Sequence, residues 1–414
     1  MFNFWYQFLH RLCAAGYFAR ITVLNLERLP KAGPVLYLGL HRNGAVDGFI
    51  YHTILTGSTF LISTQLRKNW FARLFFDGIA VVRTKDEGDR GVNTGALREC
   101  VALLRNGGRL FVFPEGTSSL GPRHLPFKSG AAQLLLDALG GPGSPIKVVP
   151  IGIHYECPWG FRSKVEVVVG APVNTALEAT LSPLGRLKEL KRRFSAALED
   201  VGVNVCSEQH QEMIQRLAYV ATLATARSYF KTLKAFEHAI PEAVLSAWQA
   251  LEPELDRRRL LRHQGVPLFP MGPVWVYLAA FLVLAPVVLL AWAMNLPPLA
   301  AAWWAGRTFP DDRNVISLWR ILAGVPAFAL WSLAVAVTLV ASSHSSWLAG
   351  YVVASGLGLW LYYRVKKLAV AVHNGLRHPD LRARVLAFRQ TVLAALEEQP
   401  GTGGVPAAQL EPVR

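Results

Sequence analysis

Short apolar runs separated by polar, helix-like stretches dominate the first 170 residues. Helical periodicity is clearest over 93–106, where Leu97, Val101 and Leu104 share one face. Strands that alternate with helices predict an α/β domain with a mixed, largely parallel sheet and helices on both faces. Apolar runs typical of buried strands occur at 21–24, 35–38, 60–63, 79–82, 109–113, 146–153 and 165–169.

The pattern changes beyond this domain. From 181 to 265 the strand pattern disappears and helical periodicity predominates, which predicts a helical extension whose histidines, His263 among them, lie on the surface. Residues 265–306 contain no charged side chain, and 274–292 is long enough to cross a bilayer. We therefore expect five parts, which are an interfacial helix at 1–17, the α/β domain at 18–180, the extension at 181–265, a membrane region at 266–368, and an amphipathic helix with a flexible tail at 369–414.

The membrane region holds two or three hydrophobic segments, because 321–341 and 347–363 are also apolar. Basic residues stand at both outer ends of the region and between its first and second segments. A first segment that enters and returns near 295–298, followed by a hairpin of two crossings, keeps all three basic stretches in the cytoplasm. We therefore expect an integral membrane protein with its α/β domain on the cytoplasmic side.

The amino-acid composition indicates which kinds of partner the protein binds. The chain has 43 Lys and Arg against 28 Asp and Glu, and 52% of its residues are hydrophobic. A basic and apolar chain favours an anionic lipid bilayer over nucleic acid. Its four cysteines are scattered, with no spacing typical of a disulfide framework or a zinc site, which fits a reducing compartment.

Polar side chains of chemical interest stand at the ends of three predicted strands. His41 follows the strand at 35–38, and Asp47 comes six positions later across the turn-forming pair Asn43-Gly44. On one helix these two side chains would point about 120° apart, so they meet only across a strand, a turn and a helix start. A carboxylate beside an imidazole makes a general base. Arg83 and Glu115 follow two further strands, and such ends gather at one edge of a parallel sheet.

These residues occur in order with other motifs. His41 and Asp47 are followed by Gly78 with Arg83, by Phe113-Pro114-Glu115-Gly116-Thr117, and by Val149-Pro150-Ile151. Over about residues 20–175 the series resembles the four blocks of the PlsC-like phospholipid and glycerol acyltransferases. The most specific block is Phe-Pro-Glu-Gly-Thr after an apolar strand.

The resemblance implies transfer of a fatty acyl group from acyl-CoA or acyl carrier protein to a hydroxyl of glycerol-3-phosphate or lysophosphatidate. In it His41 is the general base and Asp47 orients it. Arg83 binds phosphate, and Glu115 accepts from acceptor hydroxyls. Gly116, Thr117 and Lys128 complete the substrate site. No cofactor or metal is implied beyond the thioester co-substrate.

Two departures bear on the acceptor. Five residues separate His41 from Asp47 where four are commoner in the family, a variant that resembles some glycerol-3-phosphate acyltransferases. Ser118 stands where the family often has Arg, and Arg123, His124 or Lys128 would have to supply that contact. Glycerol-3-phosphate and lysophosphatidate both stay open as acceptors. The alternatives to the enzyme are an inactive membrane scaffold with an acyltransferase shell and a lipid ester hydrolase.

Overall fold

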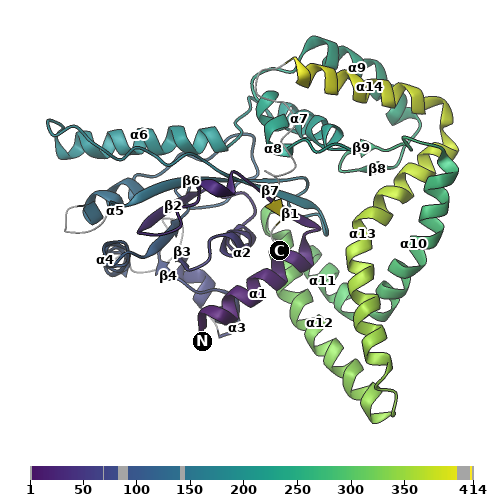
Figure 1. Ribbon diagram of the computed structural model, residues 1–414, viewed down its shortest axis with the longest axis horizontal. Helices are drawn as coiled ribbons and strands as arrows, with labels where there is room; N and C mark the ends of the chain where they lie inside the picture. The colour runs from purple at the N-terminus through teal and green to yellow at the C-terminus, as the bar shows by residue number, and fades with distance from the viewer. Residues whose placement is uncertain (1, 69, 83–91, 140–144, 399–410, 413–414) are drawn as a thin grey trace.

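The computed structural model describes residues 2–68, 70–82, 92–139, 145–398 and 411–412. An α/β unit, a helical unit and a group of long projecting helices can be followed in Figure 1. The α/β unit is built on one sheet, whose strands lie in the order β10 (Glu411–Pro412), β1 (Arg20–Leu24), β7 (Lys164–Val169), β6 (Lys147–Tyr155), β2 (Val35–Gly39), β5 (Arg109–Val112), β3 (Ser58–Ser63) and β4 (Ile79–Val81).

The sheet is mixed and largely parallel, as predicted. All neighbours from β6 through β2, β5 and β3 to β4 are parallel, whereas β7 is antiparallel to β6 and parallel to β1. β2 lies between β6 and β5, and the carboxyl ends of these three strands face the same edge. The residues that follow them are therefore brought together there.

Helices cover both faces of this sheet. One face packs against α1 (Phe2–Tyr17), α2 (Ala45–Ile54) and α3 (Trp70–Phe75). The other packs against α4 (Val92–Arg105), α5 (Gly130–Leu139) and α6 (Pro183–Val201). In Figure 1, α6 lies above the sheet and α1 and α2 below it. Short 3-10 turns complete the unit as η1 (Leu26–Arg28) and η2 (Thr64–Arg67).

The first and last helices of this unit, α1 and α6, both pack against the sheet, although the sequence assigns them to parts outside the α/β domain. The sequence places α6 in the helical extension, but its Leu190, Phe194 and Leu198 belong to the same apolar core as the sheet. α1 has two apolar faces. Leu9 and Cys13 are buried against the α/β core, and the exposed side chains of the other face are Phe4, Trp5, Phe8 and Leu12.

The helical unit draws on distant parts of the chain. α7 (Glu208–Ala221), α8 (Tyr229–Ala235) and α9 (Glu242–Arg257) share one core with α14 (Pro379–Glu397), which lies beside α9 in Figure 1. Trp248 of α9 meets Phe388 of α14 with ring centroids 5.4 Å apart. The hairpin of β8 (Arg262–His263) and β9 (Val266–Pro267) adjoins this core. α14 therefore packs into the helical unit even though the long helices separate the two in sequence.

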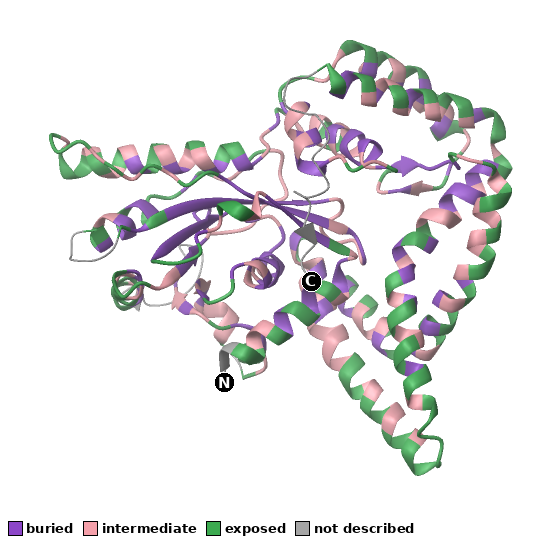
Figure 2. Ribbon diagram, in the orientation of Figure 1, coloured by how far each residue is buried: buried purple, intermediate pink, exposed green. Residues whose placement is uncertain are grey.

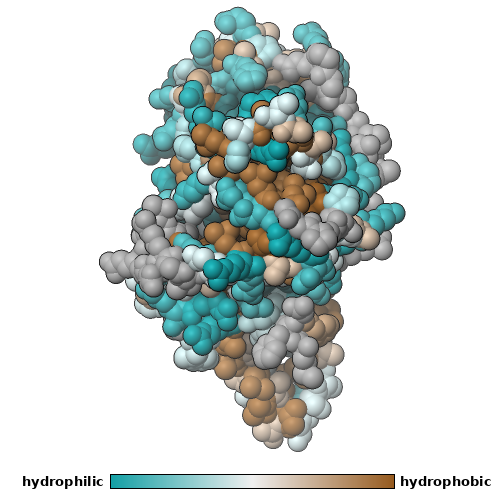
Figure 3. Space-filling model, turned by 90° about the vertical axis from the view of Figure 1, so that its left-hand side faces the viewer, coloured by the Kyte–Doolittle hydropathy of each residue, from teal (hydrophilic) through white to brown (hydrophobic). Residues whose placement is uncertain are grey.

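The long helices are α10 (Val274–Met294), α11 (Leu296–Thr308), α12 (Ile316–Ala341) and α13 (Trp347–Arg377), with the turn η3 (Arg313–Val315) before α12. Two stretches, Val274–Met294 and Arg313–Ala341, are long and apolar enough to cross a membrane, and few of their side chains are buried. Figure 2 shows this exposure along α10 and α12, and Figure 3 shows an apolar projection at the foot of the molecule. Figure 1 places the junction of α12 and α13 at that foot.

Gly78, just before β4, is expected to tolerate no side chain. Its φ is +145°, and an added Cβ would lie 2.1 Å from the main-chain oxygen of Phe60. We expect Gly78→Ala to lower the free energy of unfolding by about 3 kcal/mol or more, since strain and overlap add. Gly95→Ala is the matched control, because a Cβ there meets nothing within 4 Å in helix α4. Thermal unfolding of both variants in detergent tests this, and equal transition temperatures would contradict it.

Candidate active site

A short loop at the end of β2 carries the predicted pair. β2 ends at Gly39, His41 follows after Leu40, and α2 begins at Ala45, so the chain runs strand, turn and helix start as predicted. Gly44 has φ +54°, and its carbonyl accepts from Asp47 N at 3.2 Å. This turn absorbs the fifth residue between the pair. His41 Nδ1 and Asp47 Oδ2 are consequently 2.9 Å apart.

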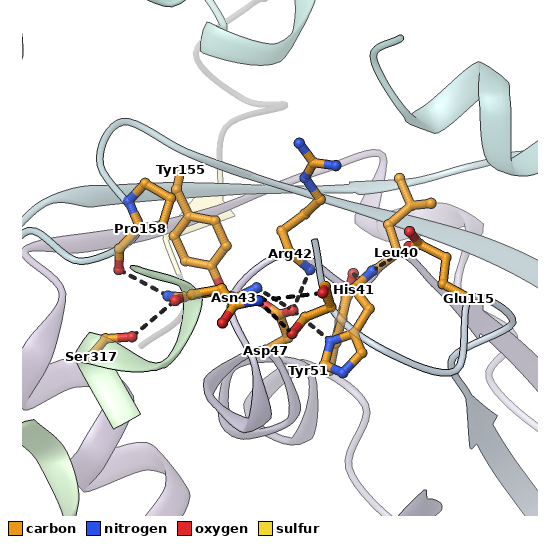
Figure 4. Close-up of polar contacts among 12 residues, drawn as sticks. Leu40, His41, Arg42, Asn43, Asp47, Tyr51, Glu115, Tyr155, Pro158 and Ser317 are labelled. Atoms are coloured by element: carbon orange, nitrogen blue, oxygen red, sulfur yellow. Dashed lines mark hydrogen bonds and ion pairs between the residues drawn. The ribbon is translucent and has the colours of Figure 1, made fainter. Parts of the chain in front are cut away.

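Asp47 is the centre of the loop's hydrogen bonds (Figure 4). Its Oδ2 accepts from His41 Nδ1 and from the main-chain N–H groups of Arg42 at 2.6 Å and Asn43 at 2.8 Å. Its Oδ1 accepts from the Tyr155 hydroxyl at 2.5 Å. Burial and the nearby Asp47 carboxylate raise the pKa of Tyr155 well above its ordinary value, so this phenol stays protonated and donates. Four donors fix a carboxylate that is 0% exposed.

The His41 ring has one engaged and one available nitrogen. It stacks on Phe113 with centroids 3.9 Å apart, and its side chain is 11% exposed. Because Nδ1 faces a carboxylate, the ring donates there and presents Nε2 as a proton acceptor. Within the described residues Nε2 has no hydrogen-bond partner. The arrangement is that of a general base oriented by a carboxylate.

Glu115 lies beside His41 but differs from its expected role as an open acceptor for substrate hydroxyls. Its Oε1 accepts from His41 N at 2.8 Å, and its Oε2 accepts from Leu125 N at 3.0 Å. The residue is 2% exposed. Burial raises the pKa of Glu115, and the hydrogen bonds from the two main-chain N–H groups oppose that rise. In the structure Glu115 braces the His41 end of β2 against the 115–128 loop.

The rest of the Phe-Pro-Glu-Gly-Thr block contacts Lys128. Gly116 has φ +72°, and a Cβ there would lie 2.7 Å from Lys128 Nζ. Lys128 is exposed, and its main-chain N–H donates to the Pro114 carbonyl at 2.9 Å. Thr117 is half-buried in the same turn. The structure thus places Gly116 and Lys128 in contact, next to the brace that positions His41.

The structure describes Arg42 near the site but not Arg83. Arg83, the predicted phosphate ligand, lies outside the described residues. The sequence alone indicates no role for Arg42. Its Nη2 donates to the Gly121 carbonyl at 2.8 Å, and its Nη1 is buried without a partner among the described residues. With Tyr155 and Arg313 it lines a cavity of about 360 Å³, and burial lowers its pKa.

The start of α12 closes over the His41 loop from nearly 300 residues away. Ser317 Oγ donates to Asn43 Oδ1 at 3.0 Å, and Asn43 Nδ2 donates to the Pro158 carbonyl at 2.9 Å (Figure 4). Asn314 Nδ2 lies 3.1 Å from Ser118 Oγ. Asn43 and Ser317 are both 0% exposed. The membrane-length helix is therefore part of the support of the site.

We expect Ser317→Ala to lower kcat about tenfold while leaving the fold intact. The variant leaves the buried Asn43 oxygen without its donor, which costs about 1–2 kcal/mol and loosens the loop that aims His41. Ser332→Ala, on the same helix and bonded to Tyr351 rather than to the loop, is the matched control. Steady-state kinetics of both proteins decides the matter. A Ser317→Ala enzyme as fast as the control would show that α12 does not position the loop.

The described residues contain no group of three or more His, Cys, Asp and Glu side chains able to hold a metal ion. The four cysteines are unpaired, and Cys13 and Cys100 are buried. The polar groups that the structure gathers at this edge are the His41 and Asp47 pair, Glu115 and Arg42.

Comparison with known families bears on this edge directly. Residues 20–154 match the acyltransferase family. This segment runs from β1 almost to the end of β6 and includes His41, Asp47 and Glu115. This segment is an acyltransferase domain.

Two relatives with similar sequences are named glycerol-3-phosphate O-acyltransferases. The chain is 35% identical over 82 residues to glycerol-3-phosphate O-acyltransferase 2 of Saccharomyces cerevisiae, covering 20% of this chain and 11% of that protein. It is 32% identical over 110 residues to glycerol-3-phosphate O-acyltransferase 1 of the same yeast, covering 25% of this chain and 14% of that protein. The chain thus matches only about a tenth to a seventh of these relatives' length.

Among solved structures, the chain is similar to the 1-acyl-sn-glycerophosphate acyltransferase PlsC from Thermotoga maritima. The two share 21% identity with a TM-score of 0.33, over 47% of this chain and 78% of that one.

Proposed function

We propose that this protein transfers a fatty acyl group from a thioester, on CoA or acyl carrier protein, to a hydroxyl of glycerol-3-phosphate or lysophosphatidate. The observation that carries the proposal is the hydrogen bond of 2.9 Å between His41 and Asp47 inside an acyltransferase domain. The yeast relatives, which are named glycerol-3-phosphate O-acyltransferases, favour glycerol-3-phosphate as acceptor.

In the proposed reaction His41 Nε2 takes the proton of the acceptor hydroxyl as its oxygen attacks the thioester carbonyl. Asp47 stabilises the imidazolium that forms. The tetrahedral intermediate then collapses, the carbon–sulfur bond breaks, and the imidazolium returns the proton to the leaving thiolate. Glu115 acts through His41 as a positioning residue, since its carboxylate holds the main-chain N–H of that residue.

The acceptor phosphate would bind near the Gly116 turn. Lys128 is an exposed cation at that turn, and its ammonium lies against Gly116. Thr117 and the main-chain N–H groups of the same turn would also contact the phosphate. Arg83 is proposed as its second cation. The glycine at 116 leaves room for the Lys128 ammonium beside the turn, since a Cβ there would lie 2.7 Å from Nζ.

We place the protein in a membrane, with the acyltransferase domain on the cytoplasmic side. The supports are the two membrane-length apolar stretches and the basic residues around them, among them Arg262 before the first stretch and Arg307 between the two. The exposed apolar face of α1 would lie on the same bilayer. The proposed partners are that bilayer, the thioester carrier and the glycerol phosphate acceptor, with no cofactor or metal.

The test uses the purified full chain in detergent with an acyl-CoA of defined length. Glycerol-3-phosphate, lysophosphatidate, dihydroxyacetone phosphate and glycerol are offered separately, and products are separated into acylated acceptor and free fatty acid. We expect acylated acceptor, with a phosphate-bearing acceptor far ahead of glycerol. Release of free fatty acid without acceptor acylation would indicate a hydrolase. No consumption of the thioester, whether acyl-CoA or acylated acyl carrier protein is offered, would indicate an inactive scaffold.

A further inference from the structure

A second cavity, of about 630 Å³, lies where α10 and α13 meet the helical unit. Its walls are mainly apolar and include Leu251, Leu255, Phe269 and Phe388. Leu284 of α10 and Trp360 of α13 continue these walls onto the long helices, where Trp360 is 55% exposed. Cavities of this volume hold ligands the size of a small lipid or drug molecule.

The charged side chains that line this cavity, among the described residues, are all positive. Five of its lining side chains are cations, and none of those described is acidic. The cations are Arg20, Lys164, Arg364, Lys367 and Arg389. An apolar chamber whose described lining contains cations and no carboxylate matches an amphiphile with an anionic head.

Neither Arg364 nor Lys367 has a carboxylate within ion-pair distance among the residues that the structure describes. Lys367 instead lies over the rings of Tyr219 and Tyr363, at 5.6 Å from each centroid. Arg364 lies over Trp360 at 4.4 Å. Burial, together with the neighbouring charge of Lys164, lowers the pKa of Lys367 to about 8. Two cations on one helix, a turn apart, thus stand ready for an anion.

We propose that this cavity binds an anionic phospholipid from the bilayer, with its phosphate at Arg364 and Lys367 and an acyl chain among the leucines and phenylalanines of the helical unit. The lipid would enter from the side of the long helices, because Leu284 of α10 and Trp360 of α13 line the cavity. The site is separate from the His41 site, and the proposal does not depend on the acyltransferase reaction.

The cavity also touches the α/β unit through Arg20 of β1 and Lys164 of β7. Lys164 of β7 lines it, and its Nζ lies 3.7 Å from Glu156 Oε1. Tyr363 donates to Glu156 Oε2 at 2.8 Å. Glu156 is the neighbour of Tyr155, the hydroxyl donor of Asp47. A lipid seated in the cavity therefore binds a surface shared by the long helices and the domain that holds the site.

The experiment is native mass spectrometry of the full chain in a neutral detergent. The probes are dioctanoylphosphatidylglycerol and dioctanoylphosphatidylcholine, which share chains and differ in net charge. We expect one copy of the anionic lipid to stay bound and the zwitterionic lipid to bind at least about tenfold more weakly. Inorganic phosphate at millimolar concentration is expected not to displace the lipid, because it has no chain to bury.

Three variants make the test specific. The double variant Arg364→Gln with Lys367→Gln should bind the anionic lipid about tenfold more weakly, or weaker still. Ala371→Phe, which fills the buried wall at a residue 4% exposed, should exclude both lipids. Lys366→Gln, exposed on the same helix and outside the cavity, should bind like the parent protein. Thermal unfolding confirms that each variant is folded.

Three results would overturn the proposal. They are equal binding of the two lipids, unchanged binding by the folded double variant, and displacement of the lipid by inorganic phosphate alone. The first would mean that the head charge is not recognised, the second that the lipid sits elsewhere, and the third that the site takes a free anion.

Discussion

Replacing His41 by Ala is expected to lower kcat for acyl transfer by about 10³- to 10⁴-fold. A positioned general base contributes about 10²- to 10⁴-fold to such reactions. His41 is expected at the upper end, because its ring is held by Asp47 at 2.9 Å and by the Phe113 ring at 3.9 Å between centroids. No other described histidine faces this loop closely enough to bond Asp47.

The measurement is steady-state turnover of the purified variant, with and without added imidazole. Loss of the ring leaves a space against Phe113, so millimolar imidazole should restore part of the rate. His238→Ala is the control, since the His238 side chain is 91% exposed on the helical unit. A folded His41→Ala protein within tenfold of the parent rate would exclude His41 as the base.

The second large effect is expected from Asp47→Asn, at about 100- to 1000-fold in kcat. Three N–H donors point at the Oδ2 position, from His41, Arg42 and Asn43. They force the amide oxygen of the variant into that position and its NH₂ group toward Tyr155, whose hydroxyl can turn to accept. The His41 tautomer is thereby kept, and the variant removes only the negative charge that stabilises the imidazolium.

This variant therefore separates charge from geometry. We expect its thermal transition to stay close to that of the parent protein, its KM to change little, and its rate loss to be smaller than that of His41→Ala. Tyr155→Phe is the companion variant, because it removes the hydroxyl at Oδ1 and keeps the carboxylate. An Asp47→Asn protein that turns over at the parent rate would show that the carboxylate charge has no part in the reaction.

Local patterns in the sequence predict much of this site. The apolar run at 35–38, the Asn43-Gly44 turn and the following helix predict that His41 and Asp47 meet, and they do. The alternation of strands and helices likewise predicts the mixed sheet. The first inference depends on residues close together in sequence, where strand, turn and helix geometry fixes the outcome. The second depends only on the order of strands and helices along the chain.

Contacts between distant segments could not be predicted in the same way. Nothing near Ser317 in the sequence indicates that its hydroxyl meets Asn43, 274 positions earlier. A carboxylate directly after a strand predicts that Glu115 faces substrate, yet both its oxygens accept hydrogen bonds from main-chain N–H groups. His263 was expected on the surface and is 1% exposed, since its Nδ1 is paired with the Tyr219 hydroxyl at 2.7 Å.

The junction of η3 and α12 has a practical consequence for isolating the acyltransferase domain. A fragment ending after α6 keeps every strand of the sheet except β10, together with the helices on both faces. It lacks Asn314 and Ser317, so Asn43 Oδ1 and Ser118 lose their partners. Such a fragment should be folded and yet slow. Detergents that loosen α12 should likewise inactivate the intact protein before its sheet unfolds, so activity and thermal melting will rank detergents differently.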